Sequence, residues 1–477
     1  MKYLQGTKLI TEQHPEILSD ESSLKGGFCS KVYWPDCSAE ITQILRDNYG
    51  SKIPTTISGA RTGITGAAVP FGGFVISTEK LKGLSETSVD NIITAKAGET
   101  LDSITEFCKK FKPDYFYPPD PTETTASIGG TIATDASGAG SYLYGSTRKW
   151  ICRINVILPS GRQLIIKRNS FLFTKNTLLH PILGTLELPV LSKVQPPKNA
   201  AGLYIKPGMD LIDLFIGSEG KLGVITEADL ILHKKPEFCI SFAVFCSETQ
   251  FWNLHAELLC TNLRVKELEA MANPCLQFLT KNTGKQFPKS GDWVLITTFE
   301  LFSEEEIDSA LETFNTMLIK CDISPDSTWS AFTSAERTRL KEFRHILPET
   351  VNRIIASNSS RNLTIHKVST DTAVKPEQLR QYYNFMKEKL SNSEIEFVIF
   401  GHVGQGHLHA NLLPSTTEEL LIAEKVSESI ALEAVKLHGT VSAEHGTGKL
   451  KNNLLNLMYS TSELDAMQKL INHISQI

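Results

Sequence analysis

The sequence of 477 residues lacks several features that would assign it to a familiar class. Its nine cysteines include no C-x-x-C pair, which argues against an iron–sulfur site or a disulfide framework and favours thiols in a reducing compartment. No cluster of Lys and Arg stands out and the net charge is −5, so no nucleic-acid partner is expected. The N-terminus has no apolar core and no apolar run approaches the length of a bilayer span, so we expect neither a signal peptide nor a transmembrane segment.

What is present is typical of an ordinary soluble protein, with 41% hydrophobic and 21% charged residues. The length allows two or three domains, each with its own core. The expected location is the cytoplasm, with peripheral attachment to a membrane left open.

Histidines gather in two short stretches near the C-terminus, 401–411 and 442–448. Together the stretches hold four His, one Glu and one Asn among glycines. Neutral imidazoles with one carboxylate suit Zn, Mn or Fe, and they also suit acid–base catalysis. The alternative is a set of unrelated polar residues on a solvated strand edge.

The spacing of the first stretch predicts its geometry. Residues 396–400 read as a buried strand, and the glycines after it break any helix. His407, His409 and Asn411 then alternate with apolar residues, so they should share one face of a second strand. A capped helix over 416–439 should return the chain to the second stretch.

A glycine-rich turn, Ser58 to Gly66, is the second strong signal. It lies between predicted strands at 53–57 and 73–77, where exposed backbone N–H groups can form an anion-binding nest. The turn matches neither the P-loop nor the Rossmann pattern. Similar side-chain-poor segments occur at 118–121, 126–138, 144–148 and 217–227, which suggests backbone lying close to a long ligand; the alternative is a set of tight turns.

Hydrophobic periodicity predicts the remaining elements. Helices are expected at 38–48 and 97–111, a hairpin at 151–166, and an irregular, elaborated loop at 167–210. In the second half, strands near 238–245 and 293–300 alternate with helices near 248–261 and 303–319. That order predicts an antiparallel sheet covered by helices on one side.

The glycine segments, followed by Phe400 to Asn411 and by Glu444 to Lys449, resemble the FAD-linked D-2-hydroxy-acid dehydrogenases of the vanillyl-alcohol-oxidase flavoprotein superfamily. This family includes D-lactate, glycolate and D-2-hydroxyglutarate dehydrogenases. The resemblance runs from about residue 38 to the C-terminus. It implies an α+β fold with an FAD-binding domain of two α+β subdomains (1–235), a substrate domain with an antiparallel sheet covered by helices (236–395), and a C-terminal segment that completes the metal and active site (396–477).

The resemblance also implies the FAD-binding residues. The loop Ser58, Gly59, Ala60, Arg61, Thr62 and Gly63 would hold the pyrophosphate. The ribityl chain and flavin ring would be lined by Pro119, Ser127, Gly129, Gly130, Thr131, Thr134 and Gly138, and Ile225 would meet the adenine. Some members of the superfamily bond FAD to a His of the glycine-rich loop. No His lies between residues 15 and 179, so we expect non-covalent FAD.

In the substrate half, the resemblance makes His402, His409 and Glu444 the ligands of a divalent metal, with zinc first and Mn or Fe as alternatives. It makes His445 the catalytic base, Asn411 a substrate contact and Arg344 the residue that grips the substrate carboxylate. Arg suits that task because its planar fork pairs bidentately with a carboxylate. From the residues alone, Arg344 could equally form a surface ion pair on a helix.

Three positions depart from the family pattern. Gln405 stands where the family usually has an acid, which would weaken support for the metal site. Ser369 replaces a Lys of the hydroxyglutarate enzymes, which disfavours a dicarboxylate substrate. Ala60 and Arg61 replace glycines of the commonest loop.

The expected activity is FAD-dependent oxidation of a D-2-hydroxy acid, lactate- or glycolate-like, to the 2-oxo acid, with hydride transfer to flavin and a metal orienting the substrate. Electrons would pass to an unidentified acceptor, which could be a quinone, a cytochrome, a flavoprotein or oxygen, and a homodimer is one assembly considered. Two alternatives stay open: a flavin-holding subunit of a larger oxidase complex, and a flavin-dependent transferase resembling alkylglycerone-phosphate synthase.

Overall fold

The computed structural model describes residues 2–51, 53–287 and 291–477, and its chain forms two compact units. The first unit contains Met1–Gly138, Gly145–Lys235 and Ser442–Ile477. The second contains Ala139–Tyr144 and Pro236–Val441. The three predicted functional domains stay a prediction, and the predicted C-terminal segment 396–477 is divided between the two units.

The first unit contains a four-stranded sheet in the order β1-β2-β4-β3, with parallel pairing among the last three strands. Its strands are β1 (Lys2–Gln5), β2 (Lys31–Trp34), β3 (Thr55–Ser58) and β4 (Phe74–Ser77). Helix α2 (Ser38–Asn48) packs on it through Ile41, Ile44 and Leu45, which share a core with Phe74. The helix predicted at 38–48 is therefore confirmed, because its apolar residues recur at helical spacing.

A five-stranded antiparallel sheet forms the other half of the first unit, in the order β5-β6-β12-β8-β9. Its strands are β5 (Leu84–Glu86), β6 (Ile92–Lys96), β8 (Ile151–Ile157), β9 (Gln163–Lys167) and β12 (Val224–Ile231). Pairing of β8 with β9 confirms the predicted hairpin. Helix α3 (Leu101–Phe111) starts later than predicted, because Thr100 caps it and residues 97–99 form a turn.

The stretch 167–210 is more ordered than predicted. It contains a hairpin of β10 (Thr177–His180) and β11 (Gly184–Glu187), in which the buried side chains of Leu178 and Leu186 lie opposite each other. These strands are short, so alternation alone gives a weak signal. The other elements of the unit are α1 (Thr7–Gln13), β7 (Tyr115–Phe116), α4 (Ile128–Thr134), α6 (Leu211–Phe215), β13 (His233–Lys234), α13 (Leu455–Met458) and α14 (Thr461–Ser475).

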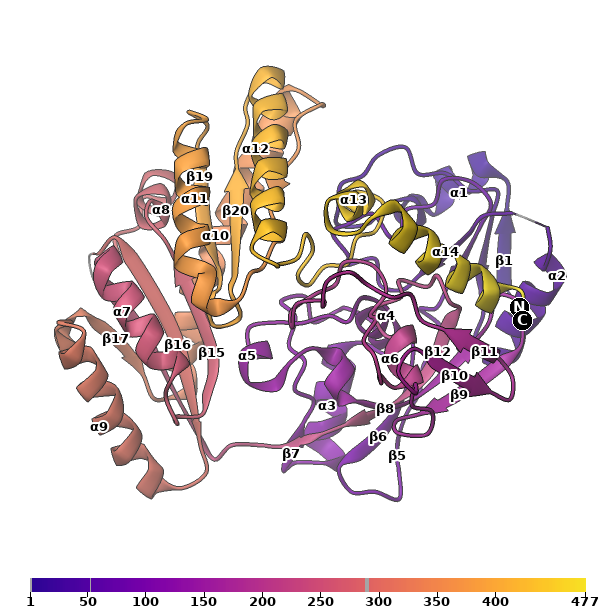
Figure 1. Cartoon of the computed structure of the whole chain (residues 1–477), viewed down its shortest axis with the longest axis horizontal. Coiled ribbons are helices and arrows are strands. Elements are labelled where there is room, and N and C mark those ends of the chain that lie inside the picture. The colour runs from indigo at the N-terminus through magenta and orange to yellow at the C-terminus, as the bar shows by residue number, and fades with distance from the viewer. Residues whose placement is uncertain (1, 52, 288–290) are drawn as a thin grey trace. The chain divides into compact units, whose positions relative to one another are not determined.

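The second unit is built on a seven-stranded antiparallel sheet in the order β17-β14-β16-β15-β19-β20-β18, much of which can be followed in Figure 1. The strands are β14 (Phe238–Cys246), β15 (Val265–Met271), β16 (Trp293–Leu301), β17 (Thr328–Ala331), β18 (Val368–Ser369), β19 (Phe397–His402) and β20 (His407–Leu412). Its helices are α5 (Ser141–Tyr144), α7 (Glu248–Leu259), α8 (Cys275–Thr283), α9 (Glu304–Lys320), α10 (Ser334–Arg361), α11 (Leu379–Ser391) and α12 (Thr417–Lys436).

Helices cover both faces of this sheet, so the prediction of one covered side is wrong. Phe242 and Val244 of β14 belong to a core with α7, α9, α11 and α12. The intervening Ala243 and Phe245 belong to a second core with α8 and α10. Strand β16 is buried at every position, as expected of a strand covered on both faces, although Thr297, Thr298 and Glu300 interrupt its apolar residues.

The predicted strand–turn–strand and final helix near the C-terminus are confirmed as β19, β20 and α12. The hydroxyl of Thr416 accepts a hydrogen bond from the backbone N of Glu419 at 3.1 Å, as a capping box requires. The Glu419 carboxylate instead accepts from the backbone N of Ser415 at 2.6 Å, so the predicted box is only half formed.

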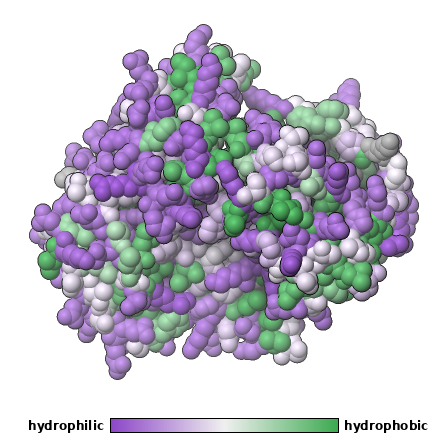
Figure 2. Space-filling view, in the orientation of Figure 1, coloured by the Kyte–Doolittle hydropathy of each residue, from purple (hydrophilic) through white to green (hydrophobic). Residues whose placement is uncertain are grey.

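The face shown in Figure 2 is mainly hydrophilic, and its hydrophobic side chains lie in separate groups. Among the described residues, we find no helix with both the length and the apolar character needed to cross a membrane.

Arg148 joins three segments of the first unit and generates a stability prediction. Its guanidinium lies 3.0 Å from Asp135 Oδ2 and 3.3 Å from Asp213 Oδ1, and it donates to Ile216 O at 2.6 Å. Arg148→Met should lower the stability of this unit by about 3–5 kcal/mol, because it leaves the largely buried Asp135 carboxylate without its guanidinium partner, whereas Asp213 keeps Arg168 at 2.7 Å. Urea denaturation measures the loss. Lys109→Met is the control: it breaks only an exposed pair with Glu106, so the midpoint should hardly move.

Candidate functional site

The predicted FAD loop starts where β3 ends, at the carboxyl end of the parallel strands of the first sheet. Ser58 lies opposite Ser77 of β4, and both side chains are fully buried. Neither hydroxyl has a hydrogen-bond partner among the residues that the structure describes. Buried polar atoms without a partner indicate a bound ligand or water, and this end of parallel strands is where ligands usually lie. Sequence reasoning missed Ser77.

Ser127 links this loop to α4. Its hydroxyl accepts hydrogen bonds from the backbone N of Ala60 and of Gly130, each at 3.3 Å. A Cβ on Gly59 would lie 2.5 Å from Ser127 Oγ, so the loop can approach the helix only with glycine there. The structure therefore brings the predicted pyrophosphate loop together with the predicted ribityl and flavin segment.

Ala97 joins α4 to the strand that carries Ile225. Its carbonyl accepts from the backbone N of Gly129 at 2.8 Å, and its own N–H donates to Thr226 O at 2.9 Å. A Cβ on Gly129 would lie 2.8 Å from the Ala97 Cβ, which explains the glycine. Backbone contacts of this kind cannot be predicted from the composition or the periodicity of the sequence.

The remaining predicted FAD residues lie around the same helix. A Cβ on Gly138 would lie 2.0 Å from Asp120 O, which places Gly138 against the segment of buried Pro119. The hydroxyls of Thr131 and Thr134 donate to carbonyls of α4 itself, each at 3.0 Å.

Arg61 adopts a left-handed backbone conformation, with φ of +63°. This conformation favours glycine, which gives a physical reason for the glycine that the commonest loop pattern carries. The guanidinium donates to Gly59 O at 3.2 Å and lies 3.4 Å from Glu79 Oε2. Its charge is thus partly balanced by a carboxylate.

The loop that follows His445 is held in the first unit by Glu219. The Glu219 carboxylate accepts from the Thr447 hydroxyl at 2.9 Å and from the backbone N of Gly448 at 2.7 Å. Its own backbone N donates to Ala133 O of α4 at 2.8 Å. The loop also contacts the FAD loop, because Thr65 donates to His445 O at 3.3 Å. The segment of Glu444 and His445 therefore lies beside the predicted FAD segments.

Glu444 has a cationic neighbour that sequence reasoning missed. Its Oε2 lies 2.9 Å from Lys198 Nζ, and both side chains are more than nine-tenths buried. Ser137 donates to the same oxygen at 3.4 Å, and His445 Nε2 lies 3.4 Å from Oε1. Lys198 lies in the stretch predicted to be an irregular loop, where no pattern marked it.

In the second unit, β19 and β20 carry the predicted histidines on one face of the sheet. Leu408 and Ala410 point to the core of α11 and α12, so His407, His409 and Asn411 point to the face covered by α8 and α10. The rings of His407 and His409 are 4.1 Å apart. Strand β20 lies between β19 and β18, and His407 and Asn411 are buried, so the alternative of a solvated strand edge is wrong.

His402 and His409 each have a polar partner that orients the imidazole ring. His402 Nδ1 lies 2.9 Å from Glu269 Oε1, and His409 Nδ1 lies 3.0 Å from Thr370 O. Ligating histidines usually donate one ring N–H to a carboxylate or carbonyl, which fixes the other nitrogen, here Nε2, as the ligand atom. The contacts of His402 and His409 therefore fit a metal site.

His407 has a different partner: its Nε2 lies 3.0 Å from Asp371 Oδ1, and its side chain is fully buried. Asn411 is 1% exposed, and neither polar atom of its side chain has a hydrogen-bond partner within the described part of the chain. An amide buried in that way is expected to meet a ligand or water. This fits the predicted substrate contact.

Arg344 of α10 is part of a largely buried ion pair rather than a surface one, because its partner Glu269 is buried and Arg344 itself is 16% exposed. Its Nε donates to Glu269 Oε2 at 2.5 Å, and its Nη2 donates to Oε1 at 3.4 Å. Burial alone would raise the pKa of Glu269, but the charges and hydrogen bonds of Arg344 and His402 outweigh it and hold that pKa well below its usual range. Sequence reasoning missed Glu269.

Gln405 contacts α5. Its side-chain carbonyl accepts from the Ser141 hydroxyl at 2.8 Å, and its amide donates to Ser141 O at 3.0 Å. A carboxylate could not donate to that carbonyl, so glutamine suits these two contacts. Ser369, the other departure in this unit, lies directly opposite Asn411 in the pairing of β18 with β20.

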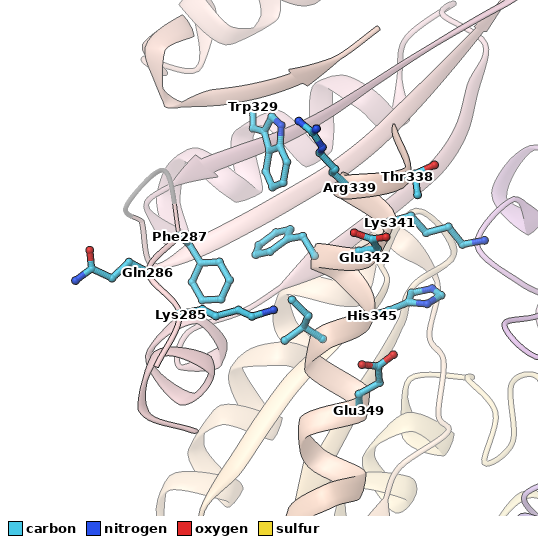
Figure 3. Close-up of a pocket in the computed structure, with 12 residues that line it drawn as sticks. Lys285, Gln286, Phe287, Trp329, Thr338, Arg339, Lys341, Glu342, His345 and Glu349 are labelled. Atoms are coloured by element: carbon cyan, nitrogen blue, oxygen red, sulfur yellow. The ribbon is translucent and has the colours of Figure 1, made fainter. Parts of the chain in front are cut away.

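A pocket of about 660 Å³ lies beside α10 (Figure 3). Phe287, Trp329 and Phe343 form an aromatic wall, and Lys285, Arg339 and Lys341 bring positive charge. Phe343 and His345 line this pocket while Arg344 between them reaches Glu269, because successive residues of a helix point in different directions. The described residues that line it include none of the predicted site residues.

Comparison with known families identifies the class of protein. The family described as "FAD linked oxidases, C-terminal domain" matches residues 236–474, and the one described as "FAD binding domain" matches residues 30–167. The chain belongs to the FAD-linked oxidases. It is an FAD-dependent oxidoreductase of the α+β class, as the sequence predicted.

Curated relatives resemble most of the chain. A D-lactate dehydrogenase of Anaerostipes hadrus is 26% identical over 93% of this chain and 87% of its own length. A D-2-hydroxyglutarate dehydrogenase of Xanthomonas citri pv. viticola is 26% identical, over 92% and 85%. The glycolate oxidase subunit GlcD of Bacillus subtilis is 25% identical, over 92% and 85%.

Ser127 provides a test of the FAD cradle. Ser127→Ala removes the hydroxyl that accepts from Ala60 and Gly130, and a lost cap or hydrogen bond typically costs about 1 kcal/mol. We expect FAD affinity to fall about fivefold, measured by titrating FAD into the apoprotein and following flavin fluorescence. Ser103→Ala at α3 is the control, since it removes a cap contact with Thr100 elsewhere in the same unit. Equal FAD affinity in the wild type and in Ser127→Ala would contradict the role of this hydroxyl.

Proposed function

We propose that this FAD-dependent oxidoreductase oxidises a D-2-hydroxy acid, lactate- or glycolate-like, to the corresponding 2-oxo acid. The observation that carries the proposal is one face of the second unit's sheet, where His402 and Asn411 are buried and His409 and Arg344 are partly buried. The names of the relatives support the same class of substrate. Ser369 lies opposite Asn411 and favours a small acid, because a serine carries no positive charge to bind a second carboxylate.

Each polar side chain of the predicted site would have a separate role in binding or oxidising such a substrate. Arg344 would pair with the carboxylate through the Nη edge of its guanidinium, while Glu269 contacts the Nε edge. Asn411 would hydrogen-bond the substrate. His445 would accept the hydroxyl proton, because a neutral imidazole nitrogen is a common general base. FAD, when bound, supplies the two-electron acceptor.

A divalent metal, zinc first among the candidates, would be held by His402, His409 and Glu444. Three protein ligands leave positions open for substrate, as a catalytic site needs. When bound, the ion would act as a Lewis acid on the substrate hydroxyl. The contacts of His402 with Glu269 and of His409 with Thr370 support this ligand set.

The partner that removes electrons is a quinone, a cytochrome or another flavoprotein, and a homodimer is the assembly we propose to test first. A second candidate function, a flavin-holding subunit of a larger oxidase complex, is favoured by one relative that is itself named a glycolate oxidase subunit. The transferase alternative has no such support among the relatives named above.

Anaerobic substrate screening tests the proposed function. Small D-2-hydroxy acids should bleach the visible absorbance of the bound flavin, and the matched L-acids should not. D-lactate and D-glycerate with their L-enantiomers make the comparison, and D-2-hydroxyglutarate should react poorly because Ser369 offers no charge. If no D-2-hydroxy acid bleaches the flavin, the function is wrong.

Chelation and two histidine variants test the metal site. Chelation should abolish turnover without releasing FAD, and added Zn²⁺ should restore it. His409→Ala should lose both metal and activity. His445→Ala should keep the metal and bind substrate, with kcat lower by about 10²–10⁴, as for a missing general base. Full activity of a preparation that elemental analysis finds free of metal would refute the ligand set.

The mode of FAD attachment has a direct test. Because no His lies between residues 15 and 179, the glycine-rich loop offers no imidazole for a covalent bond. Acid precipitation should therefore release all yellow colour into the supernatant. Colour that stays with the protein pellet would show a covalent bond.

A further inference from the structure

Glu269 is an acidic residue on a strand that is otherwise buried and apolar around it. It lies on β15, where Leu268 and Ala270 point to the core on one face of the sheet and Met271 points to the core on the other. Period two puts Glu269 on the Met271 side, the face covered by α10. Its side chain is 4% exposed. A carboxylate in that position must be paired, so its partners define its role.

Two of its partners are residues to which the proposed function gives different tasks. Oε1 lies 2.9 Å from His402 Nδ1, and Oε2 accepts from Arg344 Nε at 2.5 Å. The geometry follows from the sheet: Ala270 pairs with Gly401 on β19, which brings Glu269 next to His402. Arg344 approaches from α10, which packs on that face.

We propose that Glu269 is a positioning residue that fixes the metal ligand His402 and the carboxylate-binding Arg344 relative to each other. This inference rests on the proposed function. A 2-hydroxy acid has its hydroxyl and its carboxylate on adjacent carbons. The groups that bind them must therefore keep a constant separation, and a single carboxylate in contact with both supplies that constraint. Even a small misplacement of a substrate-binding group at a reacting centre lowers the rate of the reaction strongly.

Glutamate is the residue type that this role requires. A carboxylate has two acceptor oxygens, so it can accept from an imidazole N–H and from a guanidinium at once. Glutamine would present an amide N–H to one of these two donors. Aspartate keeps the charge but is one methylene shorter, so it could not keep both contacts without movement of the strand or of α10.

The rival explanation is a purely structural ion pair that holds α10 on the sheet. Glu300 offers a matched control, because it is a buried carboxylate on the adjacent strand β16, 2% exposed. Its partners are the Tyr144 hydroxyl and Arg264, whose Nε lies 3.6 Å from Oε2. Glu269→Gln and Glu300→Gln should both lower the thermal midpoint, so stability alone does not separate the explanations.

Zinc affinity and substrate KM separate them. The four proteins compared are the wild type, Glu269→Gln, Glu269→Asp and Glu300→Gln, each treated with chelator and loaded with FAD. Zinc is titrated into each protein in competition with a zinc indicator. KM is then measured for the acid that bleaches the wild-type flavin. We expect Glu269→Gln to bind zinc about 10–100-fold more weakly, as for other residues that orient a ligating histidine, and to raise KM. Glu300→Gln should match the wild type in both.

Glu269→Asp decides the matter if the Gln variant does not fold. It should lose at least tenfold in zinc affinity or in KM, because it cannot keep both contacts. Wild-type zinc affinity and KM in a folded Glu269 variant would overturn the inference and leave the proposed function intact. A wild type that binds no zinc or oxidises no 2-hydroxy acid would overturn the proposed function and this inference with it.

Discussion

Taking a carboxylate out of water costs several kcal/mol unless an opposite charge and hydrogen-bond donors replace the lost solvent. In this protein that constraint applies to several carboxylates at or beside the predicted site. Glu269 is buried with Arg344, and Glu444 is buried with Lys198. Asp371 faces the fully buried imidazole of His407. Each partner also restricts how its neighbour can turn. The pairing that makes burial possible therefore also orients the side chains.

Most elements of the fold could be predicted from the local hydrophobic pattern of the sequence. The residues of α2, the β8–β9 hairpin and the β19–β20 pair have clear periodicity, so their type and approximate bounds could be predicted. The burial of both faces of the second unit's sheet was misjudged: β16 begins with four apolar residues, Trp293 to Ile296, but Thr297, Thr298 and Glu300 then interrupt the pattern. The β10–β11 hairpin was missed because its strands are short and its cross-strand pairs involve few residues.

The candidate site was predictable where its residues are reactive and close in sequence. His407, His409 and Asn411 alternate along one strand, so their common face could be read from spacing. Glu269 and Lys198 could not be found that way. Glu269 pairs with His402 and Lys198 pairs with Glu444, and in both pairs the two residues lie far apart in the sequence. Only the packing of strands or of loops brings them together.

The chain passes from one compact unit to the other at four points, since Ala139–Tyr144 belongs to the second unit and Ser442–Ile477 to the first. During synthesis, the second unit's Tyr144 emerges long before its partner Glu300. The first unit has to wait for its last segment, which carries the Thr447 and Gly448 contacts of Glu219. Domains usually fold as units as they leave the ribosome, from the N-terminus onward. Here the second unit has all its residues once Val441 has been made, whereas the first unit still lacks Ser442–Ile477. The predicted flavin cradle is therefore completed only when nearly the whole chain has been made.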